Sequence, residues 1–467
     1  MSRQAAVDAA TAHLDDGTFL RDLARRVAHR TDSQEGGPAL RAYLDEELVP
    51  AVEALGCTAQ VVATPVEGVG PVLVAHRRED ASLPTVLVYG HADVQPADPR
   101  QWREGLDPWV VVAEGDRWYG RGTADNKGQH GVNLAALAAV LAARGGRLGF
   151  NLTVLVETAE EIGSPGLREL CAERRDELAA DVLVASDGPR VNAGTPTLFL
   201  GSRGIAMIAL TVRRDGSHHS GNWGGALRNP ATVLASALAA VVDGRGRLLV
   251  EALRPPPVPD GVRAALRDVV LGGDAGDPEV DVGWGEPGLT PTERVLAGNT
   301  FEVLALRAAD VDRPVGAVPA LATARCQLRF VVGTDVGDVA GALRRHLDER
   351  GFADVEVDVA EVRPATRLDP ASPWVDWVQE SVRRTTGAPA TLLPNLGGTL
   401  PNDAFANVLG LPTLWLPHSH PGCRQHAPDE HLLAGVARQG LAVMAGVFWD
   451  LGEADGTEPA LRPPVRR

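Results

Sequence analysis

Ligand-type side chains stand where several short apolar runs of the 467-residue chain end. These residues are His91 and Asp93 after TVLVYG, Glu160 and Glu161 after LTVLVETA, and Asp187 after DVLVAS. Imidazole and carboxylate groups are ligands of zinc, manganese and cobalt. Sites of open α/β sheets form beyond the carboxyl ends of the strands. We therefore expect these groups to converge at one edge of a sheet and to hold a divalent metal.

Two further candidate ligands lie outside these runs. Asp125 sits in the glycine-bounded turn GRGTADNKG, and His426 follows the apolar segment LPTLWLPH. Either residue alone has an ordinary structural explanation. An aspartate beside glycines commonly caps a helix or closes a turn, and a lone histidine is commonly a structural or surface residue. The turn is no phosphate-binding loop, because it lacks the GxxxxGK[ST] order. The joint pattern of acids and histidines favours a metal site over these separate roles.

The apolar runs predict an α/β domain. Four continuous runs rich in valine and leucine are typical of strands buried on both faces, and they cover residues 71–77, 85–93, 152–158 and 181–187. Apolar residues at helical spacing predict helices within 1–60, at 131–146 and at 166–181. Strands that alternate with helices predict a mostly parallel, mixed sheet between helices.

The pattern changes near residue 197 and returns near residue 363. The intervening segment predicts a two-layer α+β unit, with alternating strands at 197–214, 322–332 and 353–363 and helices at 230–242 and 338–351. Helices at 373–385 and 431–450 then restore the α/β pattern, and a disordered tail is expected at 456–467. The predicted division is one domain in two parts, 1–197 and 364–467, interrupted by an inserted domain at 198–363.

Composition and charge exclude several partners. A net charge of −16 disfavours binding to nucleic acid or to anionic membranes. No stretch approaches eighteen uninterrupted apolar residues, so no membrane span is expected. The four cysteines show no paired spacing, and the first residues lack the apolar core of a signal peptide. We therefore expect a cytoplasmic protein with free thiols.

The ordered motifs resemble one known family. H-A-D, G-R-G-T-A-D-N-K-G, E-T-A-E-E-I-G-S, S-D-G, H-H-S-G and a late H-x-P-x-E are similar, in order and spacing, to those of the dinuclear metallopeptidases. That family contains carnosinase, aminoacylase and succinyl-diaminopimelate desuccinylase, and the resemblance covers essentially the whole chain. It implies a zinc-exopeptidase-like catalytic domain and a ferredoxin-like inserted domain that acts as a lid and dimerises.

The resemblance also implies two divalent metal ions per subunit, with zinc expected and manganese or cobalt as alternatives. One ion would be held by His91 and Asp187 and the other by Glu161 and His426, with Asp125 bridging both. Glu160 matches the general base that takes a proton from the water shared by the metals. Asp93 matches the carboxylate that orients His91. The peptide bond after Asp125 is expected to be cis.

The third carboxylate distinguishes the branches of this family. Aspartate at that position, here Asp187, is usual in carnosinase-like dipeptidases, whereas the aminoacylase and desuccinylase branches usually carry glutamate. The expected function is hydrolysis of the amide bond of dipeptides or related compounds with a free C-terminal carboxylate. An N-acyl-amino-acid amidohydrolase is the alternative, and a catalytically silent binding protein on the same scaffold is a third reading.

The inserted domain is expected to contribute substrate contacts. His219 matches the histidine that reaches across a homodimer to the partner's site and stabilises the oxyanion. Arg329 matches the arginine that binds the substrate carboxylate, near a glycine-rich turn that contains Gly398 and Thr399. Two positions depart from the family pattern: Gly316 replaces an asparagine of the lid turn, and Asp429 adds a charge before the late glutamate.

Lys127 is the only lysine of the chain, and a cation is no metal ligand. We hypothesise that its compact ammonium ties the metal-binding turn to nearby carbonyls or carboxylates, where a planar guanidinium would not fit. The alternative is an inherited lysine without energetic consequence. The sequence leaves open whether Cys423, close to His426, is redox-sensitive.

Overall fold

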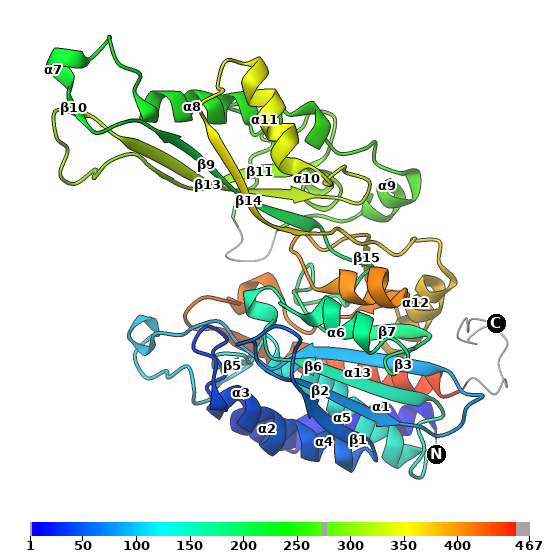
Figure 1. Cartoon of the computed structure of the whole chain (residues 1–467). Helices are drawn as coiled ribbons and strands as arrows, with labels where there is room; N and C mark the ends of the chain where they lie inside the picture. The colour runs from blue at the N-terminus through cyan, green and yellow to red at the C-terminus, as the bar shows by residue number, and fades with distance from the viewer. Residues whose placement is uncertain (1, 273–277, 454–467) are drawn as a thin grey trace.

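The computed structural model describes residues 2–272 and 278–453. These residues form two parts, each a sheet with the helices packed on it, which are called the larger layer and the second layer below (Figure 1). The larger layer contains an eight-stranded sheet. In spatial order its strands are β1 (Thr58–Val62), β2 (Val72–Arg77), β6 (Asn151–Glu157), β3 (Thr85–His91), β7 (Val182–Ala185), β16 (Thr413–Trp415), β8 (Thr197–Phe199) and β15 (Thr391–Leu393). The central neighbours β6, β3, β7 and β16 are parallel, whereas β1, β2 and β6 pair antiparallel. The predicted α/β class with a mixed, mostly parallel sheet is confirmed.

Helices cover both faces of this sheet because its strands are apolar on both. Val86 and Val88 of β3 pack into one core, and Leu87 and Tyr89 pack into the other. The helices of this layer are α1 (Arg3–Asp15), α2 (Thr18–Ala28), α3 (Pro38–Tyr43), α4 (Val49–Ala54), α5 (Lys127–Ala143), α6 (Leu167–Glu173), α12 (Pro373–Thr386) and α13 (Ala434–Leu451). Helices α1, α5 and α13 pack against one another. No described helix is long and apolar enough to cross a membrane.

The second layer contains a four-stranded antiparallel sheet in the order β11 (Thr300–Arg307), β13 (Leu321–Phe330), β9 (Gly204–Arg213) and β14 (Glu356–Arg363). Its core is completed by α8 (Pro230–Val241) and α11 (Val339–Glu349). The β-α-β-β-α-β order agrees with the expected ferredoxin-like unit. At one tip of this layer lie β10 (His218–His219), β12 (Ala317–Val318) and α7 (Ser220–Trp223) (Figure 1).

The predicted inserted segment is not confined to the second layer. Its helices α9 (Asp260–Leu266) and α10 (Pro291–Leu296) share a core with the main sheet, where Val262, Leu266 and Leu296 cluster with Leu393 of β15. Apolar residues on these two helices therefore tie the layers together. The domain boundaries at 197/198 and 363/364 stay a prediction.

Several element boundaries differ from the expected ones. The expected strand pair at 197–214 is divided between the two sheets, and the helix expected at 166–181 is regular only within α6. The segment His431–Leu433 is not helical but forms β17, which pairs with β5 (Arg117–Tyr119) and, through it, with β4 (Val112–Glu114). Backbone pairing with a distant strand outweighs the local apolar pattern there. The tail expected at 456–467 lies outside the described residues.

Candidate metal centre

The central strands of the main sheet deliver most of the candidate ligands. His91 is the last residue of β3, Asp187 follows β7, and Glu160 and Glu161 begin a 3-10 turn after β6. Strands β6, β3 and β7 are adjacent and parallel, so their carboxyl ends meet at one edge, as expected from the sequence.

Asp125 lies at the centre of the site. It precedes α5, and the bond between Asp125 and Asn126 is cis, as the resemblance implied. Asp125 Oδ1 lies 3.0 Å from His91 Nε2, and Oδ2 lies 3.0 Å from His426 Nε2. One carboxylate thus faces two imidazoles from segments far apart in the sequence.

The side chains form two overlapping groups that share Asp125. His91, Asp125 and Asp187 make the first group, and Asp125, Glu161 and His426 make the second. Asp187 Oδ2 and Glu161 Oε1 are buried without a hydrogen-bond partner among the described residues. An oxygen atom that binds a metal ion is expected to lack such a partner when the ion is absent. Carboxylate oxygens and imidazole nitrogens are also the donor set that suits divalent zinc, manganese or cobalt. The residues therefore fit a metal-binding role.

The electrostatics of the site favour added positive charge. Burial, reinforced by the charge of Asp125, raises the pKa of Asp187 to about 6 although His91 opposes the shift. Burial likewise raises the pKa of Glu160 and Glu161 well above the ordinary glutamate value, with neighbouring carboxylates adding to the effect. For Asp125, burial is outweighed by hydrogen bonds to His426 and His91, so its pKa falls below the ordinary value. A divalent cation relieves this carboxylate crowding.

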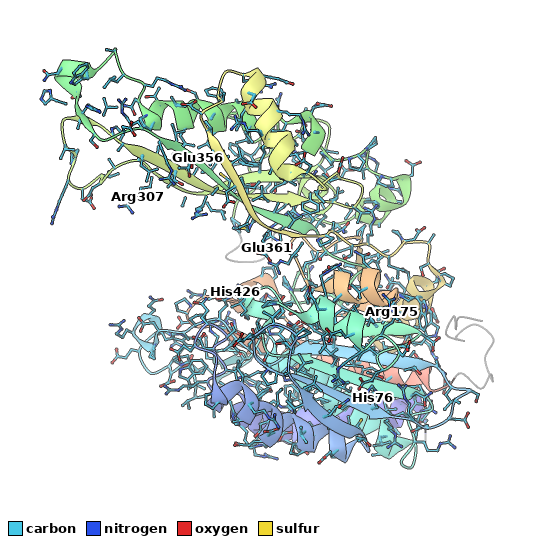
Figure 2. The ribbon with its side chains drawn as sticks, in the orientation of Figure 1. His76, Arg175, Arg307, Glu356, Glu361 and His426 are labelled. Atoms are coloured by element: carbon cyan, nitrogen blue, oxygen red, sulfur yellow. The ribbon has the colours of Figure 1, made fainter. Side chains whose placement is uncertain are left out.

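His426 is the solvent-facing member of the site. Its side chain is 56% exposed, whereas that of His91 is fully buried. Figure 2 shows His426 on the side of the larger layer that faces the four-stranded sheet. The candidate centre therefore meets solvent at His426.

Comparison with known proteins agrees with this geometry. The model of peptidase family M20/M25/M40 matches residues 87–450, which include every candidate ligand. The chain belongs to peptidase family M20/M25/M40. The family resemblance expected from the sequence is confirmed, and with it the class of metallopeptidase.

Curated M20 relatives and a solved M20 structure extend the match. The chain is 30% identical over 333 residues to the cysteinylglycine-S-conjugate dipeptidase of Corynebacterium striatum, covering 68% of this chain and 70% of that protein. It is 32% identical over 262 residues to the Beta-Ala-His dipeptidase of Homo sapiens, covering 53% of this chain and about half (51%) of that protein. The M20 family metallo-carboxypeptidase Sso-CP2 of Sulfolobus solfataricus superposes with a TM-score of 0.79 at 24% identity, covering 93% and 99% of the two chains. The relatives' names agree with the expected carnosinase-like branch.

Asp93 contacts both the His91 side and the glutamate turn of the candidate site. Its Oδ1 lies 3.3 Å from His91 Nδ1, and its backbone carbonyl lies 3.1 Å from the same nitrogen. The carboxylate also accepts hydrogen bonds from the backbone N–H groups of Glu160 and Glu161. Asp93 is therefore placed to fix the orientation of His91 and, in addition, the turn that carries the two glutamates.

Glu430 was given no role by the sequence, although the late H-x-P-x-E motif contains it. Its buried Oε1 accepts hydrogen bonds from the backbone N–H groups of Gly122, Ala124 and Asp125. Its Oε2 pairs with Arg121 Nη1 at 2.6 Å. The glutamate thus holds the turn that presents Asp125 to both groups of ligands.

Lys127 anchors the same turn from the other side. Its buried ammonium donates to the carbonyls of Arg26 at 2.9 Å and His29 at 2.6 Å, and it lies 4.8 Å from the centre of the Tyr43 ring. Burial lowers the pKa of Lys127 to about 7, against the opposing charges of Glu430 and other carboxylates. The contacts agree with the anchoring hypothesis for this lysine. Their energetic importance stays a prediction.

The candidate substrate residues fall into two places. Arg329 Nη1 donates to Thr399 Oγ1 at 2.7 Å, so the second layer meets the turn that contains Gly398. His219 instead lies exposed at the tip beside α7, away from the metal ligands of its own chain (Figure 1). Cys423 is buried, and burial raises the pKa of its thiol to about 12, which disfavours the reactive thiolate.

Proposed function

We propose that the chain is a dinuclear-metal dipeptidase that hydrolyses the amide bond of dipeptides with a free C-terminal carboxylate. The observation that carries this proposal is the position of Asp125, shared by two three-residue ligand groups. His91 and Asp187 would hold one divalent ion and Glu161 and His426 the other, with zinc expected and manganese or cobalt as alternatives. Two such ions supply Lewis acidity toward the scissile carbonyl and lower the pKa of water.

Glu160 is the proposed general base. It adjoins the ligand Glu161 but belongs to neither ligand group, and its side chain makes no hydrogen bond to the described residues. A carboxylate at this position can accept a proton from the attacking water and then donate it to the leaving amine. Asp93 supports this role by fixing the backbone of Glu160.

A pair of arginines supports the carboxylate specificity. Thr399 Oγ1 accepts from Arg329 and donates to the carbonyl of Arg203, while Arg203 Nε donates to the carbonyl of Gly397. Arg203 Nη1 is buried without a hydrogen-bond partner among the described residues. Burial, with the charge of Arg329, lowers the pKa of Arg203 to about 10. Two guanidinium groups beside one turn favour an anionic group of the substrate.

Replacement of Arg329 by glutamine is expected to reduce selectivity for a free carboxylate. Loss of one charge-assisted hydrogen bond corresponds to about 10- to 100-fold in binding. The ratio of kcat/KM for a dipeptide to that for its C-terminal amide should fall by this factor. Arg325→Gln, an exposed position on the same strand, is the matched control. An unchanged ratio in Arg329→Gln would remove carboxylate recognition from this residue.

A substrate panel tests the proposed activity. The metal-loaded protein would be assayed with Cys-Gly, its S-conjugates, β-Ala-His and other dipeptides, the first three chosen after the names of the relatives. N-acetyl amino acids form the competing set. Release of two amino acids from dipeptides supports a dipeptidase, whereas cleavage of N-acetyl amino acids alone identifies the amidohydrolase alternative. Metal retention without any turnover would indicate the silent binding protein.

We further propose a homodimer formed through the second layer, in a reducing cytoplasm. Strand β11 is a sheet edge that exposes Val303, Leu304 and Leu306, and exposed apolar edges tend to pair with another chain. The exposed tip would carry His219 to the partner's site, where its imidazole stabilises the oxyanion. The four cysteines are free and buried, which supports the compartment.

Complementation tests the shared site. Glu160→Ala and His219→Ala are each expected to be nearly inactive, because each removes one half of every site. After subunit exchange, half of the dimers combine both variants and hold one intact site, so about a quarter of the wild-type activity should return. Exchange would be followed with differently tagged subunits, and Glu160→Ala exchanged with itself is the control. No recovery despite confirmed exchange would show that the site is not shared.

A further inference from the structure

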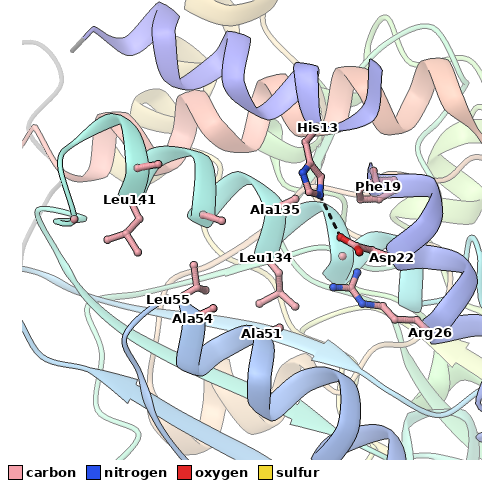
Figure 3. A pocket seen from close by; sticks show the side chains of 14 residues that line it. His13, Phe19, Asp22, Arg26, Ala51, Ala54, Leu55, Leu134, Ala135 and Leu141 are labelled. Carbon is pink, nitrogen blue, oxygen red and sulfur yellow. Dashed lines mark ion pairs between the residues drawn. The ribbon is translucent and has the colours of Figure 1, made fainter. Parts of the chain in front are cut away.

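An elongated pocket of about 380 Å³ lies between α1, α2, α4 and α5, apart from the metal ligands (Figure 3). Its walls are mainly apolar and include Phe19, Ala51, Leu55, Leu134, Ala135 and Leu141. The residues of α5 that line it run from Gly131 to Ala142. That span corresponds to about 16 Å at 1.5 Å per residue. The shape suits a chain-like ligand.

One end of this pocket holds an arginine without a partner. Arg26 is only 6% exposed, and its Nε is buried without a hydrogen-bond partner. Within the described part of the chain, its guanidinium makes no hydrogen bond and no ion pair. Figure 3 shows the group pointing toward the pocket between Asp22 and Leu134. A buried unpaired charge is costly, so an anion at this place would be favoured.

The surrounding charges do not neutralise Arg26. Asp22, the carboxylate of the pocket wall, is engaged by His13 Nε2 at 3.3 Å and by Arg25 Nη1 at 2.7 Å. Lys127 binds the Arg26 carbonyl rather than its side chain and does not line the pocket. Asp22 therefore pairs with other groups and leaves Arg26 without an ion-pair partner among the described residues.

Gly131 makes the room that Arg26 occupies. A Cβ at this position would lie 2.4 Å from Arg26 Nη1. Glycine is a poor residue for a helix interior, and here, inside α5, its missing side chain lets the guanidinium lie against the helix at the mouth of the apolar channel. The charged group and the channel thus form one built site.

We propose that this pocket binds a small amphipathic monocarboxylate, such as a medium-chain fatty acid. The carboxylate pairs with Arg26, and the apolar chain lies along α5 against the alanine and leucine side chains. The volume is within the usual range of small-molecule pockets, about 300–1,000 Å³. A guanidinium binds a carboxylate through two parallel hydrogen bonds. With its carboxylate held at Arg26, the apolar part of the ligand extends along α5.

Isothermal titration of the metal-loaded full chain with octanoate tests the proposal. Arg26→Gln should weaken octanoate binding by about 10- to 100-fold, the effect of losing a charge-assisted contact. Because Arg26 has no partner to lose, we expect this variant to stay folded. Ala135→Phe fills the channel and should abolish binding independently. Arg21→Gln, an exposed neighbour, should leave binding unchanged.

The ligand's charge provides the second comparison. Octan-1-ol and octylamine should bind at least tenfold more weakly than octanoate, because they cannot pair with Arg26. Carboxylate binding at the metal centre would be equal in the wild type and in all three variants. Equal isotherms across the variants, equal affinity for octanoate and octan-1-ol, or no binding would each overturn the proposal.

Discussion

Replacement of Glu160 by alanine is expected to lower kcat by about 10²- to 10⁴-fold, the usual contribution of a general acid–base group. Metal content should stay at the wild-type level, because Glu160 is in neither ligand group. The fall should appear in kcat rather than in KM, since the proton transfers occur in the chemical steps. Steady-state kinetics on a dipeptide, with metal analysis of the same sample, measure both quantities.

The matched control for this experiment is Glu169→Ala. Glu169 is exposed on α6, the helix that follows the same turn, so its loss should leave kcat and metal content unchanged. Loss of metal from Glu160→Ala would contradict the general-base role and make the residue a ligand. Retained metal with wild-type kcat would assign the proton transfers to another group.

Replacement of Asp125 by asparagine is expected to weaken both proposed metal sites at once. The carboxylate lies 3.0 Å from an imidazole of each ligand group, and the amide removes the negative charge that both cations require. Substitution of groups that merely support a ligand costs about 10- to 100-fold in metal affinity, so loss of a shared ligand should cost at least as much for each ion. Metal content after dialysis should fall from about two ions per chain to less than one, and dipeptide hydrolysis should be lost.

Asp187→Asn provides the comparison for Asp125→Asn. Asp187 belongs only to the group that contains His91, so this variant should lose one ion and retain the other. Equilibrium dialysis followed by elemental analysis distinguishes the two patterns. Equal losses in the two variants would contradict the bridging position of Asp125.

The sequence predicted much of the metal centre because local patterns encode it. Apolar runs buried on both faces predict strands of a parallel sheet, and neighbouring parallel strands bring their carboxyl ends to one edge. The strand ends therefore made His91, Glu161 and Asp187 candidates, and the family resemblance distinguished them as ligands from Asp93 and Glu160. Asp125 and His426 come from a turn and a loop, so their place followed from the ordered motifs of the family rather than from periodicity.

Local patterns failed where distant segments decide the structure. The turn that carries Asp125, just before α5, is held by Glu430, which accepts hydrogen bonds from three of its backbone N–H groups. It is also held by Lys127, which donates hydrogen bonds to the carbonyls of Arg26 and His29. Every residue offers such backbone groups, so the sequence could not say which of them would be reached. The strand β17 and the packing of α9 and α10 on the main sheet were missed for the same reason.

The sequence by itself determined which groups stand at the strand ends, and therefore part of the donor set of the candidate metal centre. Only the tertiary structure decided that Arg203 lies beside Arg329, which groups support the Asp125 turn, and that a separate pocket forms at Arg26. Residue type and the succession of strands along the chain are local properties that residue identity and spacing encode. The pairing of a buried charge, or its lack of a partner, depends on how helices and loops far apart in the chain pack together.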